Sequence, residues 1–297
     1  MFQVFEGVWP ALVTPTNADN SVNVPVLCKL VDYLTAKGVH GFYVGGSTGD
    51  GIFLPLEQRK LLAETVLTRV GGRLPVIIHV GSTASDDAVA LSRHARDCGA
   101  DGVSSIIPPL YDRLESVYEY YRAVAASVPD MPLLAYLLNP TVDSVALLRR
   151  LMAIPNIAGV KYTGSNMYEF RHIIELGDGR WSIFSGMDEQ AIYGCMMGAT
   201  GLIGSTLNIM PGVYLGIQRC VQAGDYAQAQ ALQLKANRVI AGMEAVGFKG
   251  ALKVILTDLL GADTGKPQLP ALPLTESHRW TLQENLAKTD FDALMAL

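Results

Sequence analysis

The chain has 297 residues, of which 49% are hydrophobic and 17% charged, and its formal net charge is −5 at pH 7. Its lysines and arginines are scattered, so no basic stripe predicts nucleic-acid binding, and no run of about 18 apolar residues predicts a membrane span. The start of the sequence lacks a secretory-signal pattern and the four cysteines form no Cys-x-x-Cys motif, so we expect a cytoplasmic protein with reduced thiols and no zinc or disulfide framework.

Eight short apolar runs rich in valine and isoleucine alternate with amphipathic segments. The expected strands cover residues 7–13, 41–44, 76–80, 102–107, 133–136, 157–161, 181–184 and 201–204. The expected helices between them cover residues 24–37, 55–69, 84–98, 114–127, 144–153, 167–176 and 189–197. This alternation is typical of a parallel sheet buried on both faces. Eight units favour an α/β fold of the (β/α)8 TIM barrel type over an open doubly wound sheet, for which the first strand lacks the Gly-x-Gly-x-x-Gly motif.

The last part of the chain, residues 211–297, is expected to be helical. Heptad-like spacing covers residues 226–246 and 250–260, and a proline-rich connector at 267–273 precedes a last helix near 276–288. This length exceeds what one closing helix needs. We therefore predict two parts, a (β/α)8 barrel over residues 1–210 and a C-terminal helical extension over residues 211–297 that packs on the barrel or on another subunit.

One lysine, Lys161, ends the sixth apolar run. In a (β/α)8 barrel the functional groups lie at the C-terminal ends of the strands. A lysine that attacks a carbonyl carbon must be uncharged, and a partly desolvated pocket favours that form. On position alone, however, a lysine at a strand end is more often a buried stem whose ammonium reaches a salt bridge. The residues at the other strand ends decide between the two interpretations.

The second strand is followed by the sequence Gly-Gly-Ser-Thr-Gly-Asp-Gly at residues 45–51. Glycines on both sides of Ser47 and Thr48 allow backbone N–H groups to converge on a carboxylate or a phosphate. Taken alone, such a run is at least as often only a tight turn between a strand and a helix. It is therefore a candidate anion site, with a purely structural alternative.

Phenols, carboxylates and hydroxyls follow the remaining strands. Tyr111 comes after the fourth strand and Tyr136 ends the fifth, although buried tyrosines are usually core residues. Asp188 and Glu189 come after the seventh strand, where Asp188 could equally cap a helix. His79, on the third strand, is expected to be a core histidine. A lysine, a phenol, hydroxyls, an anion site and two acids, without a metal-ligand set, suit imine chemistry on a hydroxylated keto acid.

The motifs at residues 45–49, 159–163, 186–189 and 203–206, together with Tyr136, resemble the N-acetylneuraminate lyase branch of the pyruvate-dependent class I aldolases. Dihydrodipicolinate synthase belongs to the same superfamily. The resemblance runs from about residue 7 to residue 260, in order and at the expected spacings. It implies a (β/α)8 barrel with C-terminal helices, usually a homotetramer, and a reaction that needs no metal or diffusible cofactor.

The resemblance also implies roles for individual residues. Lys161 is identified as the Schiff-base lysine and Tyr136 as the phenol that shuttles the proton. Ser47 and Thr48 match the holder of the pyruvate carboxylate, and Tyr111 matches a tyrosine that completes a hydroxyl relay in a neighbouring subunit. The positions that hold the sugar's hydroxyls and glycerol tail, or line the same pocket, are Thr163, Gly186, Asp188, Glu189, Ser205 and Phe248.

The substrate that the resemblance implies is N-acetylneuraminate, a sialic acid, cleaved to N-acetylmannosamine and pyruvate. Dihydrodipicolinate synthases usually carry an arginine just after the phenol's strand, and residues 137–143 contain none. The sequence departs from the family pattern in that Leu137 and Leu138 follow the phenol, and in that Asp50 stands where glutamate is common. The alternatives are an aldolase for another 2-keto-3-deoxy sugar acid or hydroxy-oxoglutarate, dihydrodipicolinate synthase, or a non-catalytic barrel that binds a sugar acid.

Overall fold

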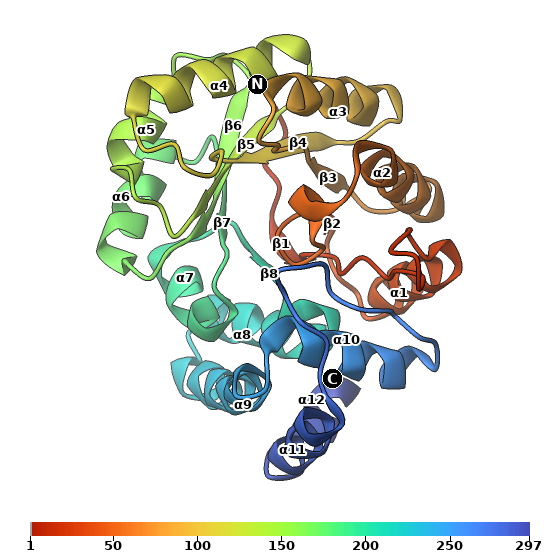
Figure 1. The fold of residues 1–297 in the computed structure, drawn as a ribbon. Coiled ribbons are helices and arrows are strands. Elements are labelled where there is room, and N and C mark those ends of the chain that lie inside the picture. Colours follow the sequence, from red (N-terminus) through yellow and green to blue (C-terminus); the bar gives the residue numbers. More distant parts are fainter. Residues whose placement is uncertain (1) are drawn as a thin grey trace.

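Eight short parallel strands form the wall of a barrel in the computed structural model, which describes residues 2–297 (Figure 1). The strands are β1 (Gly7–Pro10), β2 (Phe42–Val44), β3 (Val76–His79), β4 (Gly102–Ile106), β5 (Leu133–Leu138), β6 (Ile157–Thr163), β7 (Ser182–Ser185) and β8 (Gly201–Gly204). Each is hydrogen-bonded to its neighbour in the order β1-β8-β7-β6-β5-β4-β3-β2. An isolated bridge between Ala11 and Tyr43, with Leu12 N donating to Tyr43 O at 2.8 Å, joins the two ends. The predicted (β/α)8 barrel is confirmed.

The helices form an outer ring around these strands (Figure 1). They are α1 (Val24–Ala36), α2 (Leu56–Val70), α3 (Ser85–Asp97), α4 (Leu114–Ser127), α5 (Ser144–Leu151), α6 (Met167–Gly177), α7 (Ala191–Met197) and α8 (Pro211–Gln222). Side-chain oxygens of Asn23, Asp143 and Asn166 accept hydrogen bonds from the first turns of α1, α5 and α6. Such caps satisfy backbone N–H groups that have no partner inside the helix.

Side chains alternate between two apolar layers because successive strand residues point to opposite faces. One layer fills the barrel itself and includes Trp9, Tyr43, Tyr136 and Phe184. The other lies between the strands and the outer helices. Lys161 lies on β6 between Val160 and Tyr162, both of which belong to the outer layer. The alternation therefore directs Lys161 into the barrel.

Four further helices follow α8 and lie on one side of the barrel (Figure 1). They are α9 (Tyr226–Glu244), α10 (Phe248–Leu260), α11 (Glu276–Ala287) and α12 (Phe291–Ala296). Helix α9 packs against α8, and α10 contacts both α9 and α1. No helix within residues 2–297 is long and apolar enough to cross a membrane. The division of the chain after residue 210 stays a prediction.

Two lysines of α10 attach this C-terminal segment to the loops above the barrel. Lys253 Nζ donates hydrogen bonds to Thr14 O at 2.6 Å and to Thr264 O at 2.8 Å. Burial lowers the pKa of Lys253 to about 8. Lys249 forms an ion pair with Asp50, which also accepts a hydrogen bond from Gln268 N at 3.0 Å. The turn after β2 is thus held by residues from the end of the chain.

Strands β5 and β6 are longer than the sequence predicts, and β1 is shorter by three residues. We expected strands at 133–136 and 157–161, but Leu137 pairs with Tyr162 and Leu138 with Thr163, which extends both ladders by two residues. The first strand, expected to reach residue 13, ends at Pro10, where its pairing with β8 stops at Gly204. From Ala11 the chain turns to its single bridge with β2.

The close packing of β6 against β7 generates a stability prediction at Gly159. A Cβ atom at this position would overlap the carbonyl oxygen of Ser182, whereas a Cβ at Gly102 would lie 3.3 Å from Pro132 O. Because the barrel wall has no room to expand, we expect Gly159→Ala to lower the free energy of unfolding by about 2–3 kcal/mol and Gly102→Ala to cost less than about 1 kcal/mol. Urea denaturation of both variants measures the two values. Equal losses at the two positions would contradict the packing argument.

Candidate active site

Lys161 is 2% exposed and lies at the C-terminal end of the barrel. Its Nζ atom lies 4.3 Å from the ring centroid of Tyr136 and 4.7 Å from that of Tyr43. Among residues 2–297, no carboxylate lies within ion-pair distance of Lys161, although ten other pairs are found. The alternative of a snorkelling lysine in a salt bridge is therefore wrong. The amine occupies an aromatic pocket inside the barrel.

The phenol of Tyr136 lies between the lysine and the turn after β2. Its hydroxyl shares a hydrogen bond of 2.9 Å with Ser47 Oγ. Its ring meets the rings of Tyr43 and His79 edge-on, with centroids 6.0 Å apart in each case. A phenol with a fixed ring and a hydroxyl bonded to a second hydroxyl is suited to pass a proton along that pair.

His79 is buried behind Tyr136, as expected for a core histidine. Its Nε2 atom accepts a hydrogen bond from Ile106 N at 3.1 Å. Burial, together with the positive charges of Arg59 and Lys161, lowers the pKa of His79 well below its usual value. The ring is therefore neutral near pH 7, and it places no positive charge of its own beside Lys161.

The turn at residues 45–51 is folded so tightly that it requires glycine. Gly45 has φ 72°, in the left-handed region, and a Cβ at Gly51 would overlap the carbonyl oxygen of Gly45. The turn directs Ser47 toward Tyr136 and places Thr48 Oγ1 2.6 Å from Ser205 Oγ. Two adjacent hydroxyls thus connect β2 to β5 and to β8. Binding of a carboxylate in this turn stays a prediction.

A polar pocket of about 190 Å³ lies beside these hydroxyls. It is lined by Gly186, Asp188, Glu189, Ser205, Ile240, Glu244 and Phe248. Five of these were predicted from the sequence to bind substrate. The two from α9, Ile240 and Glu244, were missed, because no sequence pattern specifies which face of α9 reaches the barrel. The pocket thus presents the half-buried carboxylate of Glu189, the exposed carboxylate of Glu244 and the hydroxyl of Ser205.

Thr163 and Gly186 form the wall between that pocket and the lysine. The hydroxyl oxygen of Thr163 is buried and has no hydrogen-bond partner among the described residues. A Cβ at Gly186 would overlap this oxygen and would lie 3.1 Å from Lys161 Cε. Glycine at 186 is thus what allows an unpartnered hydroxyl to stand next to the lysine. Buried polar groups without partners are costly, and a ligand that bonds to Thr163 removes that cost.

The carboxylate of Asp188 points away from the start of its helix. Its Oδ2 atom accepts hydrogen bonds from Thr206 N and from Thr206 Oγ1, each 2.7 Å long. The alternative that Asp188 caps a helix is wrong. Asp188 is the first residue of a short 3-10 helix (Asp188–Gln190) whose N-cap is Met187, and the N-cap of α7 is Gln190, with no side-chain cap at either position. Desolvation raises the pKa of Asp188 to about 6 despite the two hydrogen bonds. Among the described residues, Glu189 has no hydrogen bond to its carboxylate, so it is the freer of the two acids.

Tyr111 lies outside this group of side chains. It is 55% exposed, and together with Tyr120 it lines a separate cavity of about 290 Å³ beside the start of α4. Within residues 2–297 it forms no hydrogen bond to Ser47 or Tyr136. One chain therefore does not assemble the predicted hydroxyl relay, and the role of Tyr111 stays a prediction that requires a second copy.

Tyr43 is the residue of the lysine pocket that the sequence analysis missed. It lies on the short strand β2, its ring faces Lys161 Nζ, and its hydroxyl donates a hydrogen bond of 3.0 Å to Ser104 Oγ. The signal was available, because Tyr43 stands two residues before Gly45 and alternates with Phe42 and Val44, which both belong to the outer layer.

Comparison with known proteins gives a consistent result. The profile of the dihydrodipicolinate synthetase family matches residues 4–289. An N-acetylneuraminate lyase from Rhizobium meliloti is 34% identical over 285 residues, which are 95% of this chain and 94% of that protein. The N-acetylneuraminate lyase structure from Proteus mirabilis superposes with a TM-score of 0.92 at 32% identity and covers 97% of this chain and 100% of its own.

A third relative differs in its description. It is a prophage protein from E. coli K12 that belongs to the dihydrodipicolinic acid synthase family, and its structure was determined in complex with pyruvate. It superposes with a TM-score of 0.90 at 26% identity and covers 97% of this chain and 100% of its own. Similarity at these levels extends over the whole barrel and the C-terminal helices.

The raised pKa of Asp188 generates a prediction about pH. The folded state binds this proton more tightly than the unfolded state, where the pKa is near 3.9, so the stability it contributes is present below about pH 4 and is lost as the pH rises through about 6. We expect the difference in unfolding free energy between the wild type and Asp188→Asn to fall by on the order of 1–3 kcal/mol over this range. Urea denaturation at a series of pH values measures it.

Thr206→Val provides the matched variant. The hydrogen bonds from Thr206 lower the pKa of Asp188, so removing the hydroxyl raises that pKa further and should make the pH dependence steeper than in the wild type. A difference between wild type and Asp188→Asn that stays constant across these pH values would show that the carboxyl group titrates normally.

Proposed function

The chain belongs to the dihydrodipicolinate synthetase family and is a class I aldolase of the lyase type, and from that premise we propose that its substrate is N-acetylneuraminate. The products are then N-acetylmannosamine and pyruvate. The observation that supports the chemistry best is the position of Lys161, whose buried amine has aromatic neighbours and no paired carboxylate. The covalent imine withdraws the electrons in this scheme, so no metal or diffusible cofactor is required.

The proposed reaction begins at the amine. The lone pair of neutral Lys161 Nζ attacks the C2 ketone of the substrate, and loss of water gives a protonated imine. As the C3–C4 bond breaks, its electron pair moves into the imine and forms an enamine of pyruvate, while the C4 hydroxyl proton is removed. Protonation of the enamine at C3 and hydrolysis of the imine release pyruvate and restore the lysine.

Tyr136 is the proposed group that takes the C4 hydroxyl proton. Its hydroxyl lies 2.9 Å from Ser47 Oγ, which supports a relay from the phenol through the serine. In a second copy of the chain, Tyr111 would extend this relay. Its exposure of 55%, and the complete exposure of the adjacent Leu110, support a role at an interface between subunits.

The carboxylate of the keto acid is proposed to bind in the turn after β2. There the hydroxyls of Ser47 and Thr48 stand next to backbone N–H groups. The ion pair between Asp50 and Lys249 anchors the turn to α10. Pyruvate bound to a relative of this family supports the same class of ligand here. A carboxylate held in this turn would orient the C2 carbon toward Lys161. Fixing the two reacting groups in this way lowers the entropic part of the activation barrier.

The pocket beyond Thr163 supports a sugar acid as the substrate. Glu189, Glu244 and Ser205 can each bond to a hydroxyl group, and Phe248 gives the pocket an apolar wall. The loop after β5 offers no arginine for a second carboxylate. Leu137 is fully buried on the outer face of β5, so Leu138, which is 36% exposed, is the leucine that stands at the rim.

We further propose a cytoplasmic homotetramer. Large apolar side chains are exposed on neighbouring helices α6, α7 and α9, and such surfaces commonly mark contacts between subunits. They are Tyr168, Tyr193, Met196, Tyr226 and Leu234. With the exposed loop that carries Tyr111, this surface supplies a second contact region on each chain, as a dimer of dimers requires.

Trapping with borohydride tests the chemistry. In the presence of pyruvate, reduction should add a stable adduct to the peptide that contains Lys161, and Lys161→Met should abolish it. Lys253 is the internal control, because it is also buried and has a lowered pKa of about 8 but lies outside the barrel interior. Mass spectrometry of the digested protein locates the adduct. All the proposed aldolase activities require an imine at Lys161. The absence of an adduct in the wild type, or an adduct mainly on Lys253, would therefore refute each of them.

The choice of substrate is tested separately. With N-acetylneuraminate, 2-keto-3-deoxygluconate and 4-hydroxy-2-oxoglutarate at equal concentrations, we expect pyruvate release from N-acetylneuraminate to have the highest kcat/KM. Glu189→Gln should lower that value by about 10-fold, because the sugar hydroxyls would lose a charged hydrogen-bond acceptor. It should leave cleavage of the shortest substrate nearly unchanged. Faster release from either of the other acids would assign the enzyme to another branch of the family.

A further inference from the structure

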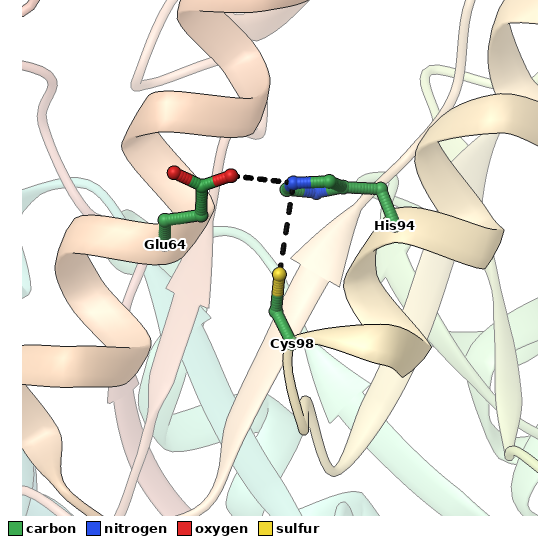
Figure 2. Close-up of side chains that lie close together, drawn as sticks. All are labelled: Glu64, His94 and Cys98. Carbon is green, nitrogen blue, oxygen red and sulfur yellow. Dashed lines mark hydrogen bonds and ion pairs between the residues drawn. The ribbon is translucent and has the colours of Figure 1, made fainter.

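Three side chains with metal-binding atoms meet on the outside of the barrel, between α2 and α3. Figure 2 shows Glu64 on α2 facing His94 and Cys98 at the end of α3. His94 and Cys98 are four residues apart, so the last turn of the helix presents both on one side. Within residues 2–297 this is the one group of three or more such residues whose ligand atoms all lie within 4.8 Å of one another.

Two of the three distances between the ligand atoms are close to those of a tetrahedral metal site, and all three atoms lie within 4.8 Å of one another. His94 Nε2 lies 2.8 Å from Glu64 Oε1 and 3.6 Å from Cys98 Sγ. Bonds of about 2.0 Å to nitrogen and oxygen and 2.3 Å to sulfur separate the ligands of tetrahedral zinc by about 3.3–3.7 Å. The nitrogen–sulfur distance already falls in this range. A shift of roughly half an ångström by the exposed glutamate side chain brings the nitrogen–oxygen distance into it.

We propose that Glu64, His94 and Cys98 form a site for a zinc-like divalent transition metal ion, with water in the fourth position. One imidazole, one thiolate and one carboxylate favour zinc or cobalt(II) over magnesium or calcium, which prefer oxygen ligands alone. The charges balance, because one thiolate and one carboxylate neutralise a divalent ion. Nearby Arg96 does not compete for Glu64, since it donates to Asp97 at 2.8 and 3.0 Å.

The site is open to an ion from solution. The side chain of Glu64 is 52% exposed and that of His94 is 20% exposed. A metal ion binds cysteine as its thiolate, so binding at this site releases the thiol proton of Cys98 to solution.

The metal site lies away from Lys161. Helix α3 runs back from the catalytic end of the barrel, and Cys98 stands four residues before Gly102, the first residue of β4, whereas Lys161 lies near the end of β6. An ion here would join α2 to α3 and stabilise the outer ring of helices. It takes no part in the imine chemistry, so its loss should leave pyruvate trapping at Lys161 unchanged.

The sequence alone predicts no metal-ligand set, because it contains no Cys-x-x-Cys motif and no paired histidines. The signal in the sequence was the spacing His94-x-x-x-Cys98 in a predicted helix. The third ligand comes from a different helix, 30 residues earlier than His94. Only the packing of α2 against α3 brings it into place.

Cobalt(II) is the probe for the experiment, because its absorption reports both tetrahedral geometry and a thiolate ligand. Titration of the full-length, chelator-treated protein should give one equivalent of bound cobalt, with a thiolate-to-cobalt band in the near ultraviolet. Zinc should displace the cobalt and raise the melting temperature. Cys98→Ser should remove the thiolate band, and Cys98→Ser, His94→Gln and Glu64→Gln should each weaken zinc binding by about tenfold or more.

His172→Gln and Cys220→Ser serve as matched controls, since they remove an exposed histidine and a partly exposed cysteine from other helices. Both should bind cobalt as the wild type does. The proposal is overturned if the wild type gives no thiolate band, if the band survives Cys98→Ser, or if the controls weaken binding as much as the site variants. Circular dichroism confirms folding, and Glu64→Gln, the most exposed of the three changes, tests the site even if another variant unfolds.

Discussion

The arrangement of the candidate active site depends on one constraint, the burial of the Lys161 amine inside the barrel. Lys161 is surrounded by the rings of Tyr43 and Tyr136 and has no carboxylate partner among the described residues. Its Nζ atom therefore faces aromatic rings inside the barrel and is not held in a salt bridge. This leaves the amine available for the proposed attack on a carbonyl carbon.

The charges of two titratable groups near this amine are limited by burial or by hydrogen bonds. His79 is neutral because burial and nearby positive charge oppose its protonation. The buried acid Asp188 accepts hydrogen bonds from both donors of Thr206, and Thr206 Oγ1 is in turn 2.6 Å from the hydroxyl of Tyr214. Thr163, which carries a hydroxyl rather than a charge, lies with Gly186 between Lys161 and the acidic pocket.

The sequence predicted well whatever depends on one segment at a time. The bounds of β8 and α4 agree with the expected residues 201–204 and 114–127, because glycines or polar residues mark both ends. Strand β5 was predicted too short, because nothing in Leu137 and Leu138 reveals that β6 continues alongside them. The bond between Asp188 and Thr206, the contribution of α9 to the pocket and the meeting of Glu64 with His94 all join distant segments. They follow from how the helices pack, which a single sequence does not display.

The ion pair between Asp50 and Lys249 has a consequence for the order in which the protein becomes functional. These residues are 199 positions apart, and Gln268, the other donor to Asp50, comes 218 positions later. Synthesis proceeds from the N-terminus, so a ribosome-bound chain can complete all eight strands and Lys161 while the turn beside them still lacks its anchors. In the proposed function, a nascent barrel therefore carries its reactive lysine before the turn that binds the keto acid is anchored. That anchoring requires Lys249 and Gln268, which are synthesised after the whole barrel.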